Sequence, residues 1–130
     1  MAPPPVKILV VDDEVYISAS VTMALGRGYQ VDAISESGEA FEVLRENSRG
    51  FDIVIADHLM PGLLGADLIK KLQGTAFHGK WILLSGHLSP ELEKSYHELG
   101  VKYVIPKPFD VAQLRNAVAA TAQGIVDHRN

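Results

Sequence analysis

The stretch IVIADHLMPG, residues 53–62, places Asp57 between four apolar residues and a Pro-Gly turn. A continuous apolar run is typical of a strand that is buried on both faces of a parallel sheet. Four runs, rich in β-branched residues, share this pattern: VKILVV (6–11), FDIVIA (51–56), KWILLS (80–85) and VKYVIP (101–106). A fifth run, YQVDAI (29–34), alternates apolar and polar residues, as an edge strand does. The repeated runs predict a parallel sheet of five strands.

Segments with helical spacing of apolar residues follow each predicted strand. Ser37, Ser89 and Asp110 stand where N-caps are expected. Five alternating strands and helices with short connections predict an α/β fold, a doubly wound (βα)5 flavodoxin-like sandwich. Pro106 would interrupt a central strand, so the fifth strand should lie at an edge. The strand order 2-1-3-4-5 satisfies this condition.

The chain has 130 residues, which suffices for one domain. We expect a flexible segment over residues 1–5, the folded domain over 6–124 and a tail over 125–130. A formal net charge of −4 argues against general binding to nucleic acid or to an anionic membrane. The sequence has no cysteine, no membrane-spanning apolar stretch and no signal-peptide pattern, so a cytoplasmic protein is expected.

Chemically useful side chains follow four of the predicted strands: Asp12, Asp13, Asp57, Ser85 and Lys107. Ligands of open parallel sheets bind beyond the carboxyl ends of the strands, where these residues should converge. Clustered carboxylates repel one another unless a cation lies among them, and oxygen ligands suit Mg²⁺. A carboxylate can also attack phosphorus and form an aspartyl phosphate. These residue types therefore predict a magnesium-dependent phosphoryl-transfer site.

The chain resembles the receiver domains of two-component response regulators, in particular the single-domain chemotaxis regulators. Four motifs carry the resemblance: VVDDE (10–14), DHLMPG with Gly65 (57–65), LLSG (83–86) and GVKYVIPKPF (100–109). The resemblance implies that Asp57 is the phosphoacceptor and that Ser85 and Lys107 contact the phosphoryl group. It further implies that Mg²⁺ is held by Asp13, Asp57 and the backbone carbonyl of Leu59, with Asp12 helping through water. The Lys107–Pro108 peptide is expected to be cis.

The chain departs from the usual family pattern at four positions: His58, Leu64, Gly86 and Val104. The departures at His58, Leu64 and Gly86 leave the predicted phosphoryl-transfer chemistry intact. Val104 stands at the switch position, where the family usually has Tyr or Phe, and Tyr103 is displaced by one residue. By the same resemblance Leu59 and His87 flank the phosphoryl group, so we expect these two residues to set its lifetime.

The resemblance implies a phosphoacceptor switch that takes its phosphoryl group from a histidine kinase or a histidine phosphotransfer protein. It would signal by docking an output partner through the predicted fourth helix, fifth strand and fifth helix. The alanine-rich final helix is either a good helix former or a docking or dimer face. Such a switch is not a turnover enzyme on an external substrate.

Two alternatives remain open at the level of the sequence. The chain could be a receiver excised from a hybrid histidine kinase or a larger regulator, although the Met1 start favours a complete protein. It could also be a phosphatase of the haloacid-dehalogenase type, which forms an aspartyl phosphate as well. That chemistry needs a second acid two residues after the nucleophile, where this chain has Leu59.

Overall fold

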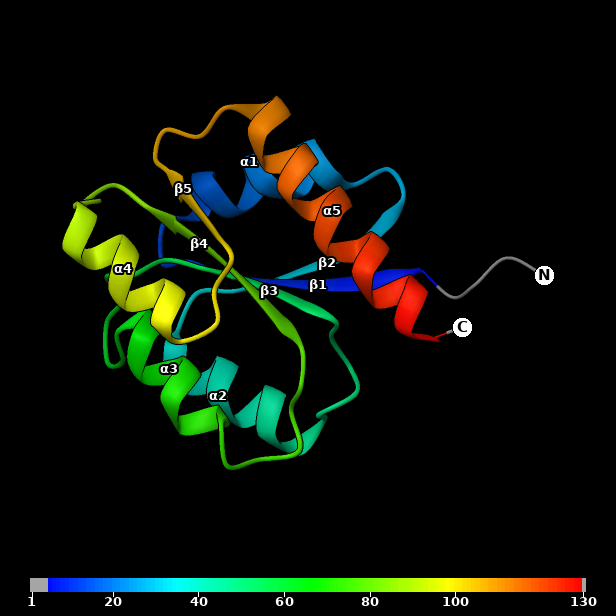
Figure 1. Ribbon diagram of the computed structural model, residues 1–130, viewed down its shortest axis with the longest axis horizontal. Helices are drawn as coiled ribbons and strands as arrows, with labels where there is room; N and C mark the ends of the chain where they lie inside the picture. Colours follow the sequence, from blue (N-terminus) through cyan, green and yellow to red (C-terminus); the bar gives the residue numbers. More distant parts are fainter. Residues whose placement is uncertain (1–4, 130) are drawn as a thin grey trace.

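The computed structural model describes residues 5–129 and contains five parallel strands and five helices in strict alternation (Figure 1). The strands are β1 (Val6–Val11), β2 (Tyr29–Ile34), β3 (Ile53–Ala56), β4 (Lys80–Ser85) and β5 (Tyr103–Pro106). The helices are α1 (Val15–Leu25), α2 (Ser37–Glu46), α3 (Gly65–Leu72), α4 (Pro90–Glu98) and α5 (Val111–Arg129).

The sheet has the order β2-β1-β3-β4-β5, which confirms the predicted doubly wound topology. β2 and β5 are the edges, so Pro106 occupies an edge strand as its missing N–H requires. The Lys107–Pro108 peptide is cis, as expected. The predicted third and fifth strands are shorter than their apolar runs and begin at Ile53 and Tyr103.

Helices cover both faces of the sheet, with α1 and α5 on one face and α2, α3 and α4 on the other (Figure 1). Alternate residues of the central strands point to opposite faces. Ile8 and Val10 of β1 pack with α1 and α5, whereas Leu9 and Val11 pack with α2 and α3. Burial of each such side chain contributes about 1.5–3 kcal/mol, so this layering stabilises the sheet that carries the site.

Two sequence predictions about helix ends are wrong. Ser37 is not an N-cap, because α2 begins at that residue and its hydroxyl bonds to a distant loop. Helix α5 continues beyond Gly124 to Arg129, where a tail was expected, because Ile125 and Val126 pack against the core. The predicted caps Ser89 and Asp110 are confirmed, since they accept hydrogen bonds from Leu92 N–H and Gln113 N–H.

Residues 1–4 of the expected N-terminal segment lie outside the described residues. Across the part of the chain that the structure describes, no helix combines the length and apolarity needed to cross a membrane. The domain boundaries themselves stay a prediction.

Candidate functional site

Three aspartates meet at the carboxyl edge of the sheet. Asp12 and Asp13 follow β1 and Asp57 follows its neighbour β3, because the two strands run parallel and in register. One carboxylate oxygen of each lies within 4.8 Å of the other two. Asp12 and Asp57 are only 2% and 7% exposed, whereas Asp13 faces solvent. The predicted convergence of these carboxylates is confirmed.

The ammonium group of Lys107 bridges this cluster. Its Nζ lies 2.8 Å from Asp12 Oδ2 and 2.9 Å from Asp57 Oδ2. Burial alone would lower the pKa of Lys107, but hydrogen bonds to Asp12, Asp57 and Glu14 outweigh it and raise that pKa. A lysine that stays charged between two buried carboxylates places fixed positive charge where an anionic group would arrive.

Burial raises the pKa of Asp12, although the hydrogen bonds from Lys107 and from Glu14 N–H oppose the shift. The Glu14 amide donates to Asp12 Oδ1 at 2.9 Å, which fixes the carboxylate at the start of α1. Burial removes most of the water that would otherwise stabilise the negative charge of Asp12, so nearby positive charge has to stabilise it instead. A second cation beside Lys107 would meet that need.

Glu14 is a member of the cluster that the sequence did not reveal. Its Oε1 lies 2.9 Å from Lys107 Nζ, and its Oε2 accepts a hydrogen bond from the Tyr16 hydroxyl at 2.5 Å. The bonds from Tyr16 and then from Lys107 lower the pKa of the Glu14 carboxyl. The acidic residue directly after Asp13 was the available signal, but its partner is 93 residues away.

Ser85 ends β4 beside the cluster and is 1% exposed. Its hydroxyl accepts a hydrogen bond from His87 N–H at 3.2 Å, and its carbonyl accepts one from Lys107 N–H at 2.9 Å. The β4–α4 loop and the β5–α5 loop are therefore joined at Ser85. His87 lies two residues after Ser85, on the loop that leads from β4 into α4.

The loop between β3 and α3 turns sharply around Asp57. A Cβ on Gly65 would lie 2.6 Å from the Asp57 carbonyl oxygen, so only glycine fits this close approach of two backbone segments. Leu59 follows in the same loop and is 46% exposed, with its N–H 3.4 Å from Asp57 Oδ1. Its side chain carries no group that could hydrogen-bond to water.

Two side chains from other helices hold this loop. The Ser37 hydroxyl donates to the Pro61 carbonyl and accepts from Leu63 N–H, both at 2.9 Å. On the opposite side, His58 Nδ1 lies 2.6 Å from the hydroxyl oxygen of Tyr96. Tyr96 lies in α4 and is fully buried, and burial raises its pKa to about 12. No pattern in the sequence indicated this bond between Tyr96 and the residue after Asp57.

The donor set of the cluster fits a hard divalent cation. Asp12, Asp13 and Asp57 offer only oxygen atoms, and Asp13 is open to solvent. Lys107 already occupies one oxygen each of Asp12 and Asp57, which leaves the other Asp57 oxygen and Asp13 for a metal. Mg²⁺ commonly binds through one or two carboxylates and keeps several waters. The cluster is thus able to hold a metal ion.

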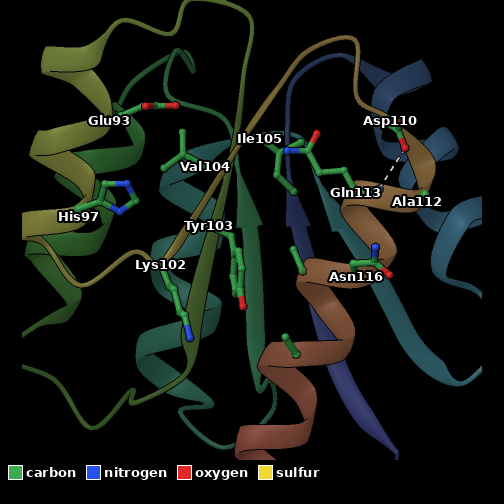
Figure 2. Close-up of a pocket in the computed structure, with 12 residues that line it drawn as sticks. Glu93, His97, Lys102, Tyr103, Val104, Ile105, Asp110, Ala112, Gln113 and Asn116 are labelled. Atoms are coloured by element: carbon green, nitrogen blue, oxygen red, sulfur yellow. Dashed lines mark hydrogen bonds between the residues drawn. The ribbon is translucent and has the colours of Figure 1, made fainter.

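The β5 residues around the expected switch position point to opposite faces of the sheet. Val104 packs with the cluster that contains Tyr96 and α4, whereas Tyr103 packs with the cluster beneath α5. Figure 2 shows the two side chains on these two sides of the strand. The displacement of Tyr103 by one residue therefore places its ring on the face of the sheet opposite to α4.

Known proteins are similar to this chain in sequence and in fold. A family model described as the response regulator receiver domain matches residues 8–119. The chain is 30% identical over 118 residues to the chemotaxis protein CheY of Treponema pallidum, covering 89% of this chain and 82% of that protein. It is 31% identical over 112 residues to the sensor kinase CckA of Brucella abortus, covering 85% of this chain. That match spans only 12% of the kinase.

A solved structure of a receiver domain has the same fold as this chain. The receiver domain of the Francisella response regulator 1452 superposes with a TM-score of 0.83 at 25% identity, covering 94% of this chain and 99% of that one. Receiver domains are phosphoacceptor switches of two-component systems rather than substrate-turnover enzymes, and they interact with histidine kinases or phosphotransfer proteins. With the family model, the topology and the acidic cluster in agreement, the chain belongs to the response regulator receiver domain family.

Proposed function

We propose that Asp57 accepts a phosphoryl group from a phosphohistidine of a histidine kinase or phosphotransfer protein, with Mg²⁺ as cofactor. The observation that carries this proposal is the Lys107 ammonium 2.9 Å from Asp57 Oδ2 in a cluster of three aspartates. An aspartate at the end of a buried strand, beside a fixed cation, is a nucleophile with its charge stabilisation already in place.

In the proposed reaction one oxygen of Asp57 attacks phosphorus. The bond between phosphorus and the donor's imidazole nitrogen breaks, and that nitrogen keeps the electron pair. Lys107 neutralises charge on the transferred group, and the Ser85 hydroxyl donates a hydrogen bond to it. Asp13, Asp57 and the Leu59 carbonyl would hold Mg²⁺, with Asp12 helping through water, and the bound ion would supply positive charge against the phosphoryl oxygens.

The test is the intact mass of the protein after incubation with acetyl phosphate, with and without Mg²⁺. We expect one added phosphoryl group only when Mg²⁺ is present, and none after chelation by EDTA. Asp13→Ala should raise the Mg²⁺ concentration needed for labelling, because the substitution removes an anionic ligand. Equal labelling in EDTA would contradict a metal-dependent reaction.

The phosphoryl group should be long-lived, because Leu59 cannot orient an attacking water. We expect Leu59→Asn to shorten the lifetime of phospho-Asp57 about tenfold, less than the roughly 10²–10⁴-fold of general acid–base catalysis, because an amide orients water without taking its proton. Leu64→Asn is the matched control, since Leu64 is a 39% exposed leucine of the same loop. The measurement is the decay of the phosphorylated mass after the phosphodonor is removed.

His87 is the second residue proposed to affect this lifetime, because it lies on the loop that begins at Ser85. If His87 orients the attacking water, His87→Ala should lengthen the lifetime. Unchanged decay in His87→Ala would remove His87 from the mechanism. Unchanged decay in Leu59→Asn, or equal acceleration in Leu64→Asn, would show that the side chain at position 59 does not limit hydrolysis.

The proposed output surface is formed by α4, β5 and α5. These elements enclose a groove of about 860 Å³ (Figure 2). Side chains of both charges line it, among them Glu93, Lys102 and Asp110. A partner or a second copy of the chain would dock here.

We expect phosphorylation to reach this surface through the β4–α4 loop rather than through a swinging ring on β5. Val104 is β-branched with a stiff χ1, and the fully buried ring in its cluster is Tyr96 on α4. Tyr96 is hydrogen-bonded to His58, directly after Asp57, so α4 is already attached to the acceptor loop. A coupling free energy of about 1–3 kcal/mol is expected, as for allosteric effects generally.

Amide NMR shifts with and without beryllofluoride and Mg²⁺ test this route. We expect the large changes within residues 85–100. Tyr96→Phe, which keeps the ring but removes the hydroxyl, should shrink the changes in α4 and leave those near Asp57. A dominant rearrangement of Tyr103 with a quiet 85–90 loop would contradict the proposal.

A further inference from the structure

A second groove lies at the amino ends of β4 and β5, at the opposite edge of the sheet from Asp57. It has a volume of about 870 Å³ and lies among Trp81 of β4, Tyr103 of β5 and the C-terminal parts of α3 and α5. Pockets for small organic ligands commonly have about 300–1,000 Å³. The proposed phosphoryl chemistry uses none of the residues that line this groove.

The charge of this groove is opposite to that of the protein. Lys80, Lys102 and His78 line it, and no aspartate or glutamate is among its lining residues within the described chain. The whole sequence carries 16 acidic and 12 basic residues. Both lysines are exposed, so their ammonium groups are free to turn toward a ligand. The groove is therefore complementary to an anion.

Aromatic rings supply the apolar surface. Trp81 and Tyr103 are half-buried, so each keeps part of its ring accessible in the groove. Phe77 packs edge-on against Trp81 at a centroid distance of 5.9 Å and supports it from the core. Lys102 Nζ lies 5.6 Å from the centre of the Tyr103 ring. The two rings lie on opposite faces of the sheet, Tyr103 on the α5 side and Trp81 on the α3 side. On the α5 side, a half-buried ring with a cation at its rim suits a flat apolar molecule that carries one negative group.

We propose that this groove is a binding site for a small aromatic anion, with the aromatic body between Tyr103 and the α5 residues Thr121 and Gly124 and the acidic group at Lys80 and Lys102. Lys102, Tyr103 and Ala120 also line the α4–β5–α5 groove. An occupant would thus contact residues that the two grooves share. Only this consequence for partner docking rests on the proposed function; the binding itself does not.

Trp81 is the single tryptophan of the chain and lines this groove, so the tryptophan fluorescence has one source beside the proposed site. The probe is 1-anilinonaphthalene-8-sulfonate, and the matched control is N-phenyl-1-naphthylamine, which has the same rings without the sulfonate. We expect saturable quenching of Trp81 by the anionic dye with a Kd about tenfold below that of the neutral dye. Two exposed ion contacts of up to about 1 kcal/mol each give a factor of this size.

The lysines are tested by the double variant Lys80→Gln/Lys102→Gln, which should raise the Kd of the anionic dye about tenfold and leave that of the neutral dye unchanged. Lys70→Gln/Lys94→Gln removes the same charge from exposed lysines outside the groove and should change neither Kd. Equal Kd values for the two dyes, or equal weakening by both double variants, would overturn the proposal.

Gly124→Leu tests the location without removing charge. Gly124 lines the groove from α5, and no heavy atom lies within 4 Å of a Cβ built there, so leucine should fold well. Leucine also favours a helix interior more than glycine does. We expect binding of both dyes to weaken at least about tenfold because the leucine side chain fills the groove. Unchanged Trp81 quenching in a folded Gly124→Leu protein would place the dyes elsewhere and overturn the proposal.

Discussion

Asp57→Asn is expected to abolish phosphorylation by acetyl phosphate completely. The amide has no anionic oxygen to attack phosphorus, and it keeps the shape of the side chain, so the fold should be unchanged. Asparagine also loses the ion pair with Lys107, whose Nζ lies 2.9 Å from Asp57 Oδ2. The measurement is intact mass after incubation with acetyl phosphate and Mg²⁺, with the unmodified chain run in parallel.

Asp32→Asn is the matched control, because Asp32 is an exposed carboxylate in the edge strand β2. It should be labelled as well as the parent chain. Labelling of Asp57→Asn at the parent level would transfer the acceptor role to another carboxylate, of which Asp13 is the exposed candidate. Peptide mapping of the labelled protein would then identify it.

The sequence predicted the fold well because its strands are short apolar runs with chemically distinct ends. β1, β3 and β4 are central strands that are buried on both faces, so continuous hydrophobicity was a reliable signal. Pro106 then indicated that the fifth strand lies at an edge of the sheet. Once the order of the strands was known, the meeting of Asp12, Asp57 and Lys107 followed from topology alone, and the structure brings them within ion-pair distance.

The contacts that the sequence did not predict all depend on side-chain reach across the fold. Glu14 contacts Lys107, and Tyr96 contacts His58 38 residues away, and neither pair has a local signature. Ser37 matched the pattern of a helix cap, but its hydroxyl bonds to the 61–63 loop instead. Helix α5 passes Gly124 because packing of Ile125 outweighs the weak helix propensity of glycine.

Lys107→Met is expected to lower the free energy of unfolding by about 3 kcal/mol when no divalent cation is present. Breaking a buried ion pair by removing one partner typically costs about 3–5 kcal/mol, and the lower end applies because the third partner, Glu14, is already partly exposed. Methionine keeps most of the side-chain volume, so the change reports charge rather than packing. Asp12 and Asp57, at 2% and 7% exposure, would be left without their shared cation.

Urea unfolding in EDTA and in Mg²⁺ measures this effect. Mg²⁺ should stabilise Lys107→Met more than the parent chain, because a ligand that binds only the folded state adds RT ln(1 + [L]/Kd) and the variant cluster carries one positive charge fewer. Lys102→Met is the control, since Lys102 is exposed and has no carboxylate partner among the ion pairs of the described residues.

A second substitution separates electrostatics from shape. In Lys107→Met/Asp12→Asn one buried negative charge is removed together with its cation, so part of the lost stability should return and the extra Mg²⁺ stabilisation should shrink. If Lys107→Met is as stable as the parent chain in EDTA, the carboxylates do not depend on this ammonium. The cation that neutralises the cluster would then have to be sought elsewhere than at position 107.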